Sequence, residues 1–495
     1  MDSPSAAGAV ERKPFLIDGC WVDNGGEALL SVDPARGRAN YAVCAASASD
    51  ADDAVKAAAR AAGQAKWRNM LPHERARLLS SIANGIDNAS EELAQLQMHE
   101  NGKVLQECRA QAKSAAATFR YYAAVCESVS DVLTPPRGNY LSMSVHEPYG
   151  VIAAITPWNS PLTMEAQKVA PALAAGNAVV LKPSEVTPST ALVLGRIALE
   201  AGLPPGLLNI LPGDGAVVGA ALVAHPGVGL VSFTGGTESG RRIARVAAGR
   251  LIPVALELGG KSPHIVFADA DIEAAVRAVA AGIFEGSGQS CIAGSRLFVE
   301  RSVYPRVLDM ITRHAKSLNI DLPDRAGAEM GSMASFAHRE RVASHVERAR
   351  VAGADITAGG SSPSDERFRD GAFYLPTVIT GVTNDAAVCQ EEIFGPVLCV
   401  LPFDGEEDLV AQANATVYGL AAGIWTSSYP KAWRVARRLD AGTVWINTYK
   451  QLSIASPFGG YKSSGIGREK GIEGMRLYQQ VKSVFWGLDL QEAAA

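Results

Sequence analysis

Between residues 151 and 233, short apolar runs alternate with longer segments in which apolar residues recur at helical spacing. Runs of this kind predict buried parallel strands joined by crossover helices. The predicted strands are Val151–Ile155, Ala178–Leu181, Leu208–Leu211 and Gly229–Phe233, and the predicted helices are Leu162–Ala175, Ser189–Ala201 and Ala216–Ala224. This pattern indicates a doubly wound α/β domain, which binds ligands where the strand order reverses.

A second α/β region begins near Gly259. Its predicted strands are His264–Phe267, Ser295–Glu300, Leu398–Pro402, Leu420–Trp425 and Thr443–Asn447, and its predicted helices are Ile272–Ile283, Val303–Lys316 and Phe336–Ala352. Asp355–Asp370 is rich in Gly, Ser and Asp, which predicts a surface loop. The expected fold class is therefore α/β with two doubly wound, Rossmann-like domains.

The segment before residue 127 reads as scaffold. Phe15–Val22 predicts a hairpin with its turn at Asp18-Gly19. Helical sequence runs from Ser49 to Trp67, and again from Pro72 to Cys126 with a break near Asn101-Gly102. Met1–Lys13 is small and polar without an apolar core, so we expect a loose tail and no signal peptide.

Two further strands are predicted outside these domains. Pro135-Pro-Arg-Gly138 precedes the strand-like Tyr140–His146, and Val481–Trp486 is a second such run near the C-terminus. An exposed ribbon of this kind invites pairing with another chain, so we expect both strands to be covered.

Length, charge and composition narrow the class of protein. The chain has 495 residues, 47% of them hydrophobic and 20% charged, as expected for a globular protein of two or more domains. A net charge of −5 argues against nucleic acid as a partner. The longest apolar runs fall short of the ~20 residues that span a bilayer, so no membrane partner is expected.

The seven cysteines are scattered, and no C-x-x-C pair occurs among them. An odd, dispersed set argues against a disulfide framework or a zinc site and favours a reducing cytoplasm. The eight histidines show no metal-ligand spacing, so we predict no metal.

One cysteine stands in an unusual setting. Cys291 lies in Gly-Ser-Gly-Gln-Ser-Cys-Ile-Ala-Gly-Ser, where small neighbours leave space for a substrate to approach the sulfur. A buried structural cysteine is the common alternative for a single Cys. Glu257, 34 residues upstream in Leu-Glu-Leu-Gly-Gly-Lys, favours a catalytic cysteine over a structural one. A thiol nucleophile and a carboxylate base are the groups needed to form a thioester and then hydrolyse it.

These two stretches resemble the aldehyde dehydrogenase superfamily, and the resemblance covers nearly the whole chain. Five more of its motifs occur in the family's order and spacing: Thr156-Pro-Trp-Asn159, Lys182-Pro-Ser-Glu185, Phe233-Thr-Gly-Gly-Thr237, Glu391-Glu-Ile-Phe-Gly-Pro396 and Pro457-Phe-Gly-Gly-Tyr-Lys462. The resemblance implies an NAD-binding domain (residues 1–126 and 149–258) and a catalytic domain (259–463). It also implies a β-hairpin element (127–148 and 478–495) that joins subunits into a homodimer or homotetramer.

The resemblance assigns the catalytic roles. Cys291 would add to an aldehyde, Asn159 and the Cys291 backbone N–H would hold the oxyanion, and Glu257 would activate water. Lys168 would support the oxyanion region; a solvated helix lysine is the alternative. On local sequence alone, the favoured role of Asn159 is to cap the helix that follows it.

Other activities stay open. Relatives that pass the acyl group to coenzyme A generally lack the residue that matches Glu257, so its presence favours hydrolysis to the free acid. The remaining alternatives are a coenzyme A-acylating enzyme, an esterase that works without a cofactor, and a silent binding protein of the same fold.

The cofactor is expected from the resemblance. No G-x-G-x-x-G is present, so the residues alone leave it undetermined. Family members bind NAD(P) without that fingerprint, and a carboxylate such as Glu185 near the ribose favours NAD over NADP. Gly235 and Gly236 open a helix whose N-terminus suits a pyrophosphate, although the family often has Ser in place of Gly236. The other expected cofactor contacts are Thr156, Trp158, Lys182, Gly215, Phe233, Leu258, His338, Glu392 and Phe394.

The substrate pocket departs from the family pattern. Ser160 and Gln167 replace aromatic residues that relatives commonly have, and Tyr449–Pro457 should line the entrance. A less aromatic pocket argues against betaine aldehyde, whose cation suits an aromatic cage. We expect a polar or heterocyclic aldehyde that hydrogen-bonds to Gln167 or Lys450, with the other pocket residues being Met164, Glu285 and Phe458.

Overall fold

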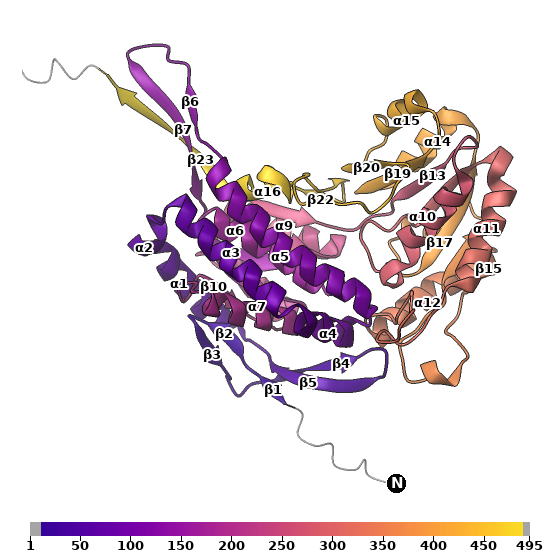
Figure 1. Ribbon diagram of the computed structural model, residues 1–495, viewed down its shortest axis with the longest axis horizontal. Coiled ribbons are helices and arrows are strands. Elements are labelled where there is room, and N and C mark those ends of the chain that lie inside the picture. Colours follow the sequence, from indigo (N-terminus) through magenta and orange to yellow (C-terminus); the bar gives the residue numbers. More distant parts are fainter. Residues whose placement is uncertain (1–10, 489–495) are drawn as a thin grey trace, which may run out of the picture.

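The computed structural model describes residues 11–488, in which two mainly parallel sheets lie in two lobes beside each other (Figure 1). The first sheet has the strand order β22-β12-β11-β8-β9-β10-β2-β3. Its parallel strands are β8 (Val151–Ile155), β9 (Ala178–Lys182), β10 (Leu208–Ile210), β11 (Leu230–Thr234) and β12 (Val254–Glu257). The chain builds outward from β8 to β10 and returns with β11 on the other side of β8, so the strand order reverses between β8 and β11.

Helices cover both faces of this sheet (Figure 1). Their apolar sides join the strands in one large core that includes Trp67, Phe119 and Ile152. The crossover helices are α6 (Pro161–Ala174), α7 (Ser189–Glu200), α8 (Ala220–Ala224) and α9 (Thr237–Arg250). The preceding helices are α1 (Ala48–Gly63), α2 (Ala65–Arg68), α3 (Pro72–Asn88), α4 (Ser90–Asn101) and α5 (Leu105–Ser128).

The second sheet has the order β15-β16-β17-β14-β13-β19-β20. Its strands are β13 (Pro263–Val266), β14 (Arg296–Glu300), β15 (Asp355–Ala358), β16 (Thr377–Thr380), β17 (Val397–Phe403), β19 (Ala421–Trp425) and β20 (Thr443–Ile446). Separate apolar clusters lie on its two faces. The larger helices are α10 (Ile272–Phe284), α11 (Tyr304–Ser317), α12 (Phe336–Val351), α14 (Gly405–Asn414) and α15 (Tyr429–Ala436).

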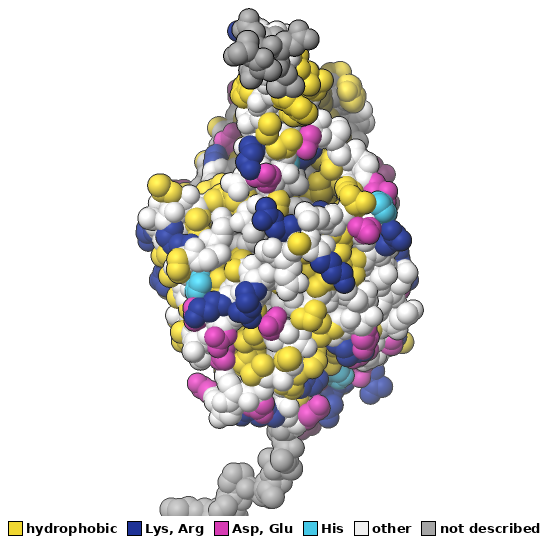
Figure 2. Space-filling model, turned by 90° about the vertical axis from the view of Figure 1, so that its left-hand side faces the viewer, with side chains coloured by type: hydrophobic (Ala, Val, Ile, Leu, Met, Phe, Trp, Pro, Cys, Tyr) yellow, Lys and Arg dark blue, Asp and Glu magenta, His cyan; other side chains and the backbone are white. Residues whose placement is uncertain are grey.

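A three-stranded ribbon projects from the first lobe (Figure 1). β7 (Tyr140–Pro148) lies between β6 (Val132–Thr134) and β23 (Gln479–Gly487), antiparallel to both. Figure 2 shows apolar side chains gathered on this ribbon. Those at least half exposed are Val132, Leu133, Val481, Phe485 and Trp486.

Three smaller groups of strands complete the fold. The N-terminal hairpin consists of β2 (Phe15–Ile17) and β3 (Cys20–Val22), and it continues the first sheet. A separate sheet contains β1 (Arg12–Lys13), β4 (Ala28–Asp33) and β5 (Arg38–Cys44). Near the C-terminus, β18 (Tyr418–Gly419) pairs with β21 (Tyr461–Lys462), and β22 (Gly465–Ile466) joins the edge of the first sheet. In the part of the chain described, no helix is long and apolar enough to cross a membrane.

Two sequence predictions are wrong. Asp355–Ala358, expected in a loop, forms the edge strand β15, which pairs with β16 through a bulge between Ile356 and Ala358. Arg12–Lys13, expected in a loose tail, pairs with β5. The remainder of that tail (1–10) and the end of the predicted hairpin element (489–495) lie outside the described residues.

Candidate active site

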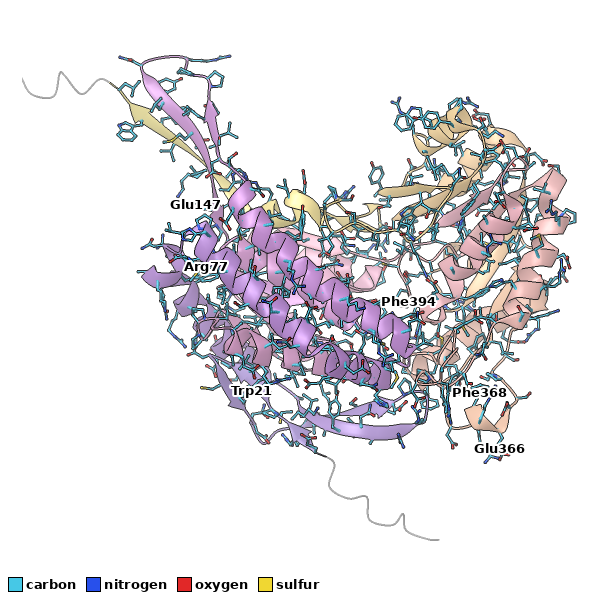
Figure 3. The ribbon with its side chains drawn as sticks, in the orientation of Figure 1. Trp21, Arg77, Glu147, Glu366, Phe368 and Phe394 are labelled. Atoms are coloured by element: carbon cyan, nitrogen blue, oxygen red, sulfur yellow. The ribbon has the colours of Figure 1, made fainter. Side chains whose placement is uncertain are left out.

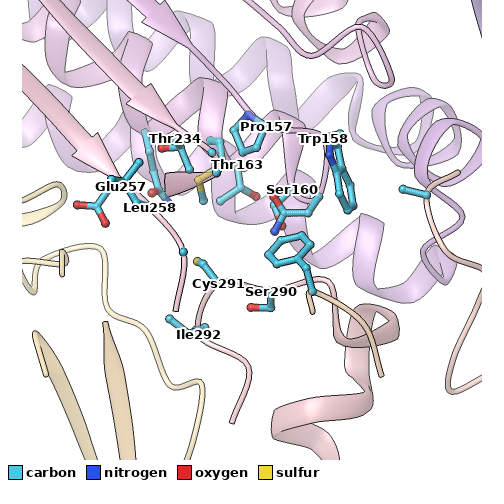
Figure 4. Close-up of a pocket in the computed structure, with 18 of the residues that line it drawn as sticks. Pro157, Trp158, Ser160, Thr163, Thr234, Glu257, Leu258, Ser290, Cys291 and Ile292 are labelled. Carbon is cyan, nitrogen blue, oxygen red and sulfur yellow. The ribbon is translucent and has the colours of Figure 1, made fainter. Parts of the chain in front are cut away.

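A cavity of about 920 Å³ lies where the strand order of the first sheet reverses. Ligands in open α/β sheets bind outside the carboxyl ends of strands at such a reversal. The segments after β8, β11 and β12 form one wall, and Ser290, Cys291 and Ile292 form part of the other (Figure 4). The volume suits a cofactor together with a small substrate.

The loop that carries Cys291 is held in an unusual conformation. Ser287 has φ +57° and is anchored by its hydroxyl, which donates to the carbonyls of Gly331 and Ser332 at 3.1 Å each. Gly288 has φ +69°, and a Cβ there would lie 2.2 Å from the Gly395 carbonyl oxygen. Only glycine fits such an approach, so the cysteine loop and the Phe394–Gly395 segment are locked together.

The Cys291 thiol is half-buried at the cleft surface. Burial, with smaller effects from the charges of Glu392 and Glu257, raises its pKa to about 12. The backbone N–H groups of Cys291 and Ile292 hydrogen-bond toward the sulfur and act in the opposite direction. At neutral pH the sulfur therefore holds its proton, and a reaction at this thiol requires a base.

Glu257 ends β12 and lines the same cleft (Figure 4). Among the described residues, neither carboxyl oxygen has a hydrogen-bond partner, and the side chain is buried. Burial and the nearby Glu469 raise its pKa well above that of an ordinary carboxyl. A Cβ at Gly459 would lie 2.8 Å from the Glu257 Oε1 atom, so glycine there keeps space beside the carboxyl. An unpaired carboxyl with a raised pKa is suited to general-base chemistry.

Asn159 does not cap the helix that follows it. Its Nδ2 atom instead donates to the Gln289 carbonyl oxygen at 2.9 Å, two residues before Cys291. The N-cap position of α6 is occupied by Ser160, which makes no side-chain cap bond. The second amide hydrogen of Asn159 stays available at the cleft wall.

Lys168 is buried about two turns into α6 and does not line the cleft. Its Nζ atom lies 2.6 Å from Glu469 Oε1 and 3.1 Å from Ser232 Oγ. Glu469 lines the cleft, as does the next residue, Lys470. Sequence reasoning missed both residues, because the ion pair joins positions 301 residues apart.

The expected ribose contacts lie at the end of β9. Lys182 is buried, and its Nζ atom lies 3.3 Å from Glu185 Oε2 and donates to the Pro183 carbonyl at 3.0 Å. Burial lowers the pKa of this lysine. Glu185 lines the cleft, whereas Lys182 does not. Gly215 begins a short π-helix, and a Cβ there would meet open space.

The N-terminus of α9 forms the next part of the wall. Gly236 is its N-cap residue, without a side-chain cap, and has open space around it. Gly235 is packed differently, since a Cβ there would lie 2.5 Å from the Phe233 ring. Phe233 and Leu258 are buried, and only Leu258 of the two lines the cleft. A helix N-terminus facing a cavity favours an anion such as a pyrophosphate.

Thr156 follows β8, and Thr234 is the last residue of β11. Each hydroxyl is buried and has no hydrogen-bond partner among the described residues. Thr234 lines the cleft and Thr156 does not. Unpartnered buried hydroxyls at this reversal, together with the open N-terminus of α9, fit a dinucleotide that supplies hydroxyl and phosphate groups.

A carboxylate and three rings close the cofactor side. Glu392 Oε1 accepts from the Gly260 N–H at 3.0 Å, and burial raises its pKa to about 7. Phe394 has φ +58°, lies between the two lobes (Figure 3), and meets the Trp158 ring edge-on at 5.3 Å. His338 contacts Trp158 at 5.1 Å and bonds the Phe394 carbonyl at 2.7 Å.

The predicted substrate residues divide into two groups. Met164, Gln167 and Phe458 line the cleft. Glu285 and Lys450 do not; the Lys450 Nζ atom donates to the Ala281 carbonyl at 3.0 Å and lies 3.7 Å from Glu285. Lys450 points away because its backbone has φ +56°. The cleft is instead lined by further polar residues, Gln111, Ser114, Ser160 and Thr163.

Fold and site define an α/β protein with a thiol, an unpaired carboxyl and a dinucleotide-sized cleft. The model of the aldehyde dehydrogenase family matches residues 21–484, so the chain belongs to this family. It is 43% identical over 483 residues to aldehyde dehydrogenase family 2 member B4, mitochondrial, of Arabidopsis thaliana, covering 97% of this chain and 89% of that protein. It is 41% identical over 473 residues to betaine aldehyde dehydrogenase of Bacillus subtilis, covering 95% and 96%.

Solved structures agree with this family assignment. The NAD+ complex of an aldehyde dehydrogenase from Bacillus cereus superposes with a TM-score of 0.94 at 41% identity, covering 97% of each chain. The fold class predicted from the sequence is thereby confirmed.

Proposed function

We propose that this chain oxidises a polar aldehyde to the free carboxylic acid with NAD. The observation that carries the proposal is the meeting of the Cys291 thiol, the unpaired Glu257 carboxyl and the Asn159 amide at one cleft, beside the reversal of a parallel sheet. The relatives support the oxidation of an aldehyde, and the structure of the Bacillus cereus enzyme supports NAD.

NAD, when bound, accepts a hydride. Gly235, Gly236 and Gly215 would hold its pyrophosphate region, Lys182 and Glu185 a ribose, and Glu392 the second ribose. Trp158, Phe394 and His338 would contact the nicotinamide half, with Thr156, Phe233 and Leu258 completing the wall. Glu185 favours NAD over NADP, because its carboxylate repels a 2′-phosphate.

Glu257 supplies the base that the Cys291 thiol needs. It accepts the thiol proton, and the thiolate adds to the aldehyde carbon to form a thiohemiacetal. Asn159 Nδ2 and the Cys291 backbone N–H donate to the resulting oxyanion. NAD, when bound, would accept the hydride, and the sulfur would keep the acyl group as a thioester. Glu257 releases the thiol proton to solvent and then removes a proton from water, whose oxygen attacks the thioester. The acid is released as the Cys291 thiolate leaves.

Lys168 acts from outside the cleft. Its ion pair with Glu469 fixes the carboxylate that raises the Glu257 pKa, and its helix carries Gln167. Gln167 is buried at the cleft wall and has no hydrogen-bond partner within residues 11–488, so its amide is available to a polar group of the substrate. Met164 and Phe458 supply apolar contact beside it.

The first lobe would hold the cofactor (residues 1–126 and 149–258) and the second the nucleophile (259–463). The ribbon of β6, β7 and β23 would join subunits, since its exposed apolar residues suit a second copy of the chain. A reducing cytoplasm is also proposed, on the number and spacing of the cysteines.

NADH formation, followed by absorbance, tests the activity. Purified protein, NAD and a panel of aliphatic, aromatic, amino and heterocyclic aldehydes are assayed with and without coenzyme A. We expect NADH without coenzyme A, and its loss in the Cys291→Ala variant. A strict need for coenzyme A, or NADH formation by the Cys291→Ala variant, would contradict the proposal.

A further inference from the structure

Lys470 is a buried cation that the proposed chemistry does not use. It is only 7% exposed, yet it lines the cleft together with Cys291, Glu257 and Phe458. Among the described residues its ammonium has no hydrogen bond and no ion pair. Its Nζ atom lies 5.4 Å from the centroid of the Phe458 ring, and the carboxyls of Glu469 and Glu257 act on it from beyond ion-pair distance. Buried charges are normally paired, so an unpaired one at a cleft wall indicates a missing anion.

The backbone of Lys470 is also strained. It has φ +60° and ψ 173°, a region that is essentially reserved for glycine. Two hydrogen bonds of 2.8 Å between Phe458 and Glu469 hold the preceding residue. The following residue, Gly471, donates to the Ile454 carbonyl at 2.8 Å and begins α16 (Gly471–Arg476). The surrounding chain therefore fixes Lys470 in place, and strain of this kind clusters at functional sites.

A free amide lies on the same wall. Gln167 precedes Lys168 and Lys470 follows Glu469, and the Lys168–Glu469 ion pair of 2.6 Å joins the two segments. Helix α16 packs against α6, which carries Gln167. Gln167 and Lys470 both line the cleft, and neither side chain has a polar partner within residues 11–488.

The charges around this wall leave it positive. Glu469 is neutralised by Lys168, and Arg468 donates to the carbonyls of Gly460 and Gly467 rather than to a carboxylate. Burial raises the pKa of Glu257, so this carboxyl is ionised to a smaller extent than an exposed one at the same pH. Burial lowers the pKa of Lys470, and no carboxylate within residues 11–488 forms an ion pair with it, so an anionic ligand would stabilise its charged form.

We propose that Lys470 and Gln167 bind a carboxylate on the substrate, so that the preferred aldehydes are short acids with an aldehyde at the other end. This inference rests on the proposed function and names its substrate class. The Lys470 ammonium would pair with the carboxylate, and the Gln167 amide would donate a second hydrogen bond. The aldehyde end would lie at Cys291, in the same cleft.

The test compares 4-oxobutanoate with its methyl ester and with pentanal. These three aldehydes are similar in size, and only the first carries a charge. With NAD and the full-length protein we expect kcat/KM to be roughly 20-fold higher for the acid than for the ester, mainly through a lower KM, because a charge-assisted bond replaces a neutral contact.

Two variants assign that preference to Lys470. Lys470→Met keeps the length of the side chain without its charge and should lower kcat/KM for the acid by about 20-fold, while the ester changes less than about twofold. Lys470→Arg should restore most of the preference. Thermal unfolding of each variant shows whether it is folded.

The outcomes distinguish a failure of the proposed function from a failure of the carboxylate-binding site. If none of the three aldehydes gives NADH, the proposed function fails. If the ester and pentanal are oxidised with the same kcat/KM as the acid, the function holds and the inference is overturned. An equal loss for all three substrates in Lys470→Met would also overturn it, since Lys470 would then act on Cys291 or Glu257 and not on the carboxylate.

Discussion

Glu257 is a single residue whose protonation state should set the pH profile of the reaction. Its raised pKa means that the carboxylate, the form that accepts a proton, is populated only well above the ordinary carboxyl range. We therefore expect kcat to rise with pH through that higher range. Glu257→Gln should lower kcat by roughly 10²–10⁴-fold, the usual contribution of a general base.

Steady-state rates from pH 5 to 10 provide the measurement. In the Glu257→Gln variant, the rise of kcat with pH that the Glu257 carboxyl causes should be absent. Circular dichroism serves as the folding control, since the glutamine is isosteric. A variant that kept both the rate and the profile would mean that another group is the base.

A substitution at Gly236 should strengthen NAD binding. It is the N-cap residue of α9 and has open space around its Cα, so a serine side chain fits. Serine is a favourable N-cap residue and adds a hydroxyl beside the proposed pyrophosphate site. We expect Gly236→Ser to lower the Kd for NAD about threefold, the effect of one modest hydrogen bond. Calorimetric titration with NAD measures this, with Gly236→Ala as the matched control that adds bulk without a donor.

Individual residues were predictable to different degrees. Cys291, Glu257 and Asn159 lie in distinctive local sequence, and the structure brings them to one cleft. The local sequence of Lys450 indicates neither its left-handed backbone nor the hydrogen bond from its amine to the Ala281 carbonyl. Lys470 gains its meaning only from an ion pair between residues distant in sequence, which no local pattern reveals.

At the scale of elements, Glu100 ties a helix to a strand and to a second helix. It lies in α4, is fully buried, and accepts from the Tyr41 hydroxyl in β5 and from Ser189 Oγ in α7 at 2.6 Å. Burial raises its pKa to about 7, against 4.5 for an ordinary glutamate. The folded protein therefore binds a proton that the unfolded chain releases between these two values.

Stability should fall as pH rises through this window, because the unfolded state then binds fewer protons than the folded state. For Glu100 the loss between pH 4.5 and 7 amounts to about 3 kcal/mol at most. Glu100→Gln, which stays neutral, should make the free energy of unfolding less dependent on pH there. Urea denaturation at several pH values measures it. An unchanged slope in the variant would show that Glu100 is already ionised in the folded protein.

Helices and strands were predicted most accurately where they are buried. The strands β8, β9 and β11 were predicted within about a residue because continuous apolar runs between helices have few other solutions. Helix α1 begins at Ala48 with Ser47 as its cap, one residue before the start predicted at Ser49. The edge strand β15 was missed because only Ala358 of its four residues is buried and a bulge interrupts its register.

At the scale of the whole molecule, backbone hydrogen bonds outside the cleft join the two lobes. Gly102 accepts from the Ser332 N–H at 3.1 Å, and the Leu105 N–H donates to the Pro323 carbonyl at 2.9 Å. A Cβ at Gly102 would lie 2.0 Å from Ser332 Oγ, and the residue has φ +71°. These contacts fix the separation of the lobes, and hence the distance between the first-lobe wall of the cleft and Cys291, which no single motif encodes.

The ribbon of β6, β7 and β23 is the surface on which the assembly should depend. Phe485 and Trp486 are 64% and 59% exposed, and both belong to β23, an edge strand with unpaired backbone groups. An exposed apolar edge favours association with a second ribbon, because pairing satisfies the backbone and removes apolar area from water. We expect the wild-type mass in solution to be a multiple of 51.9 kDa.

Replacing both aromatic residues with Asp should shift this mass toward the monomer, since burying two carboxylates at an interface is costly. Light scattering across a range of protein concentrations is the measurement. Lys482→Gln, in the same strand, is the matched control: it removes only the exposed ion pair with Glu147 and should keep the wild-type mass. If the doubly substituted protein kept the wild-type mass, the subunits would have to meet elsewhere, and the exposed ribbon would need another partner.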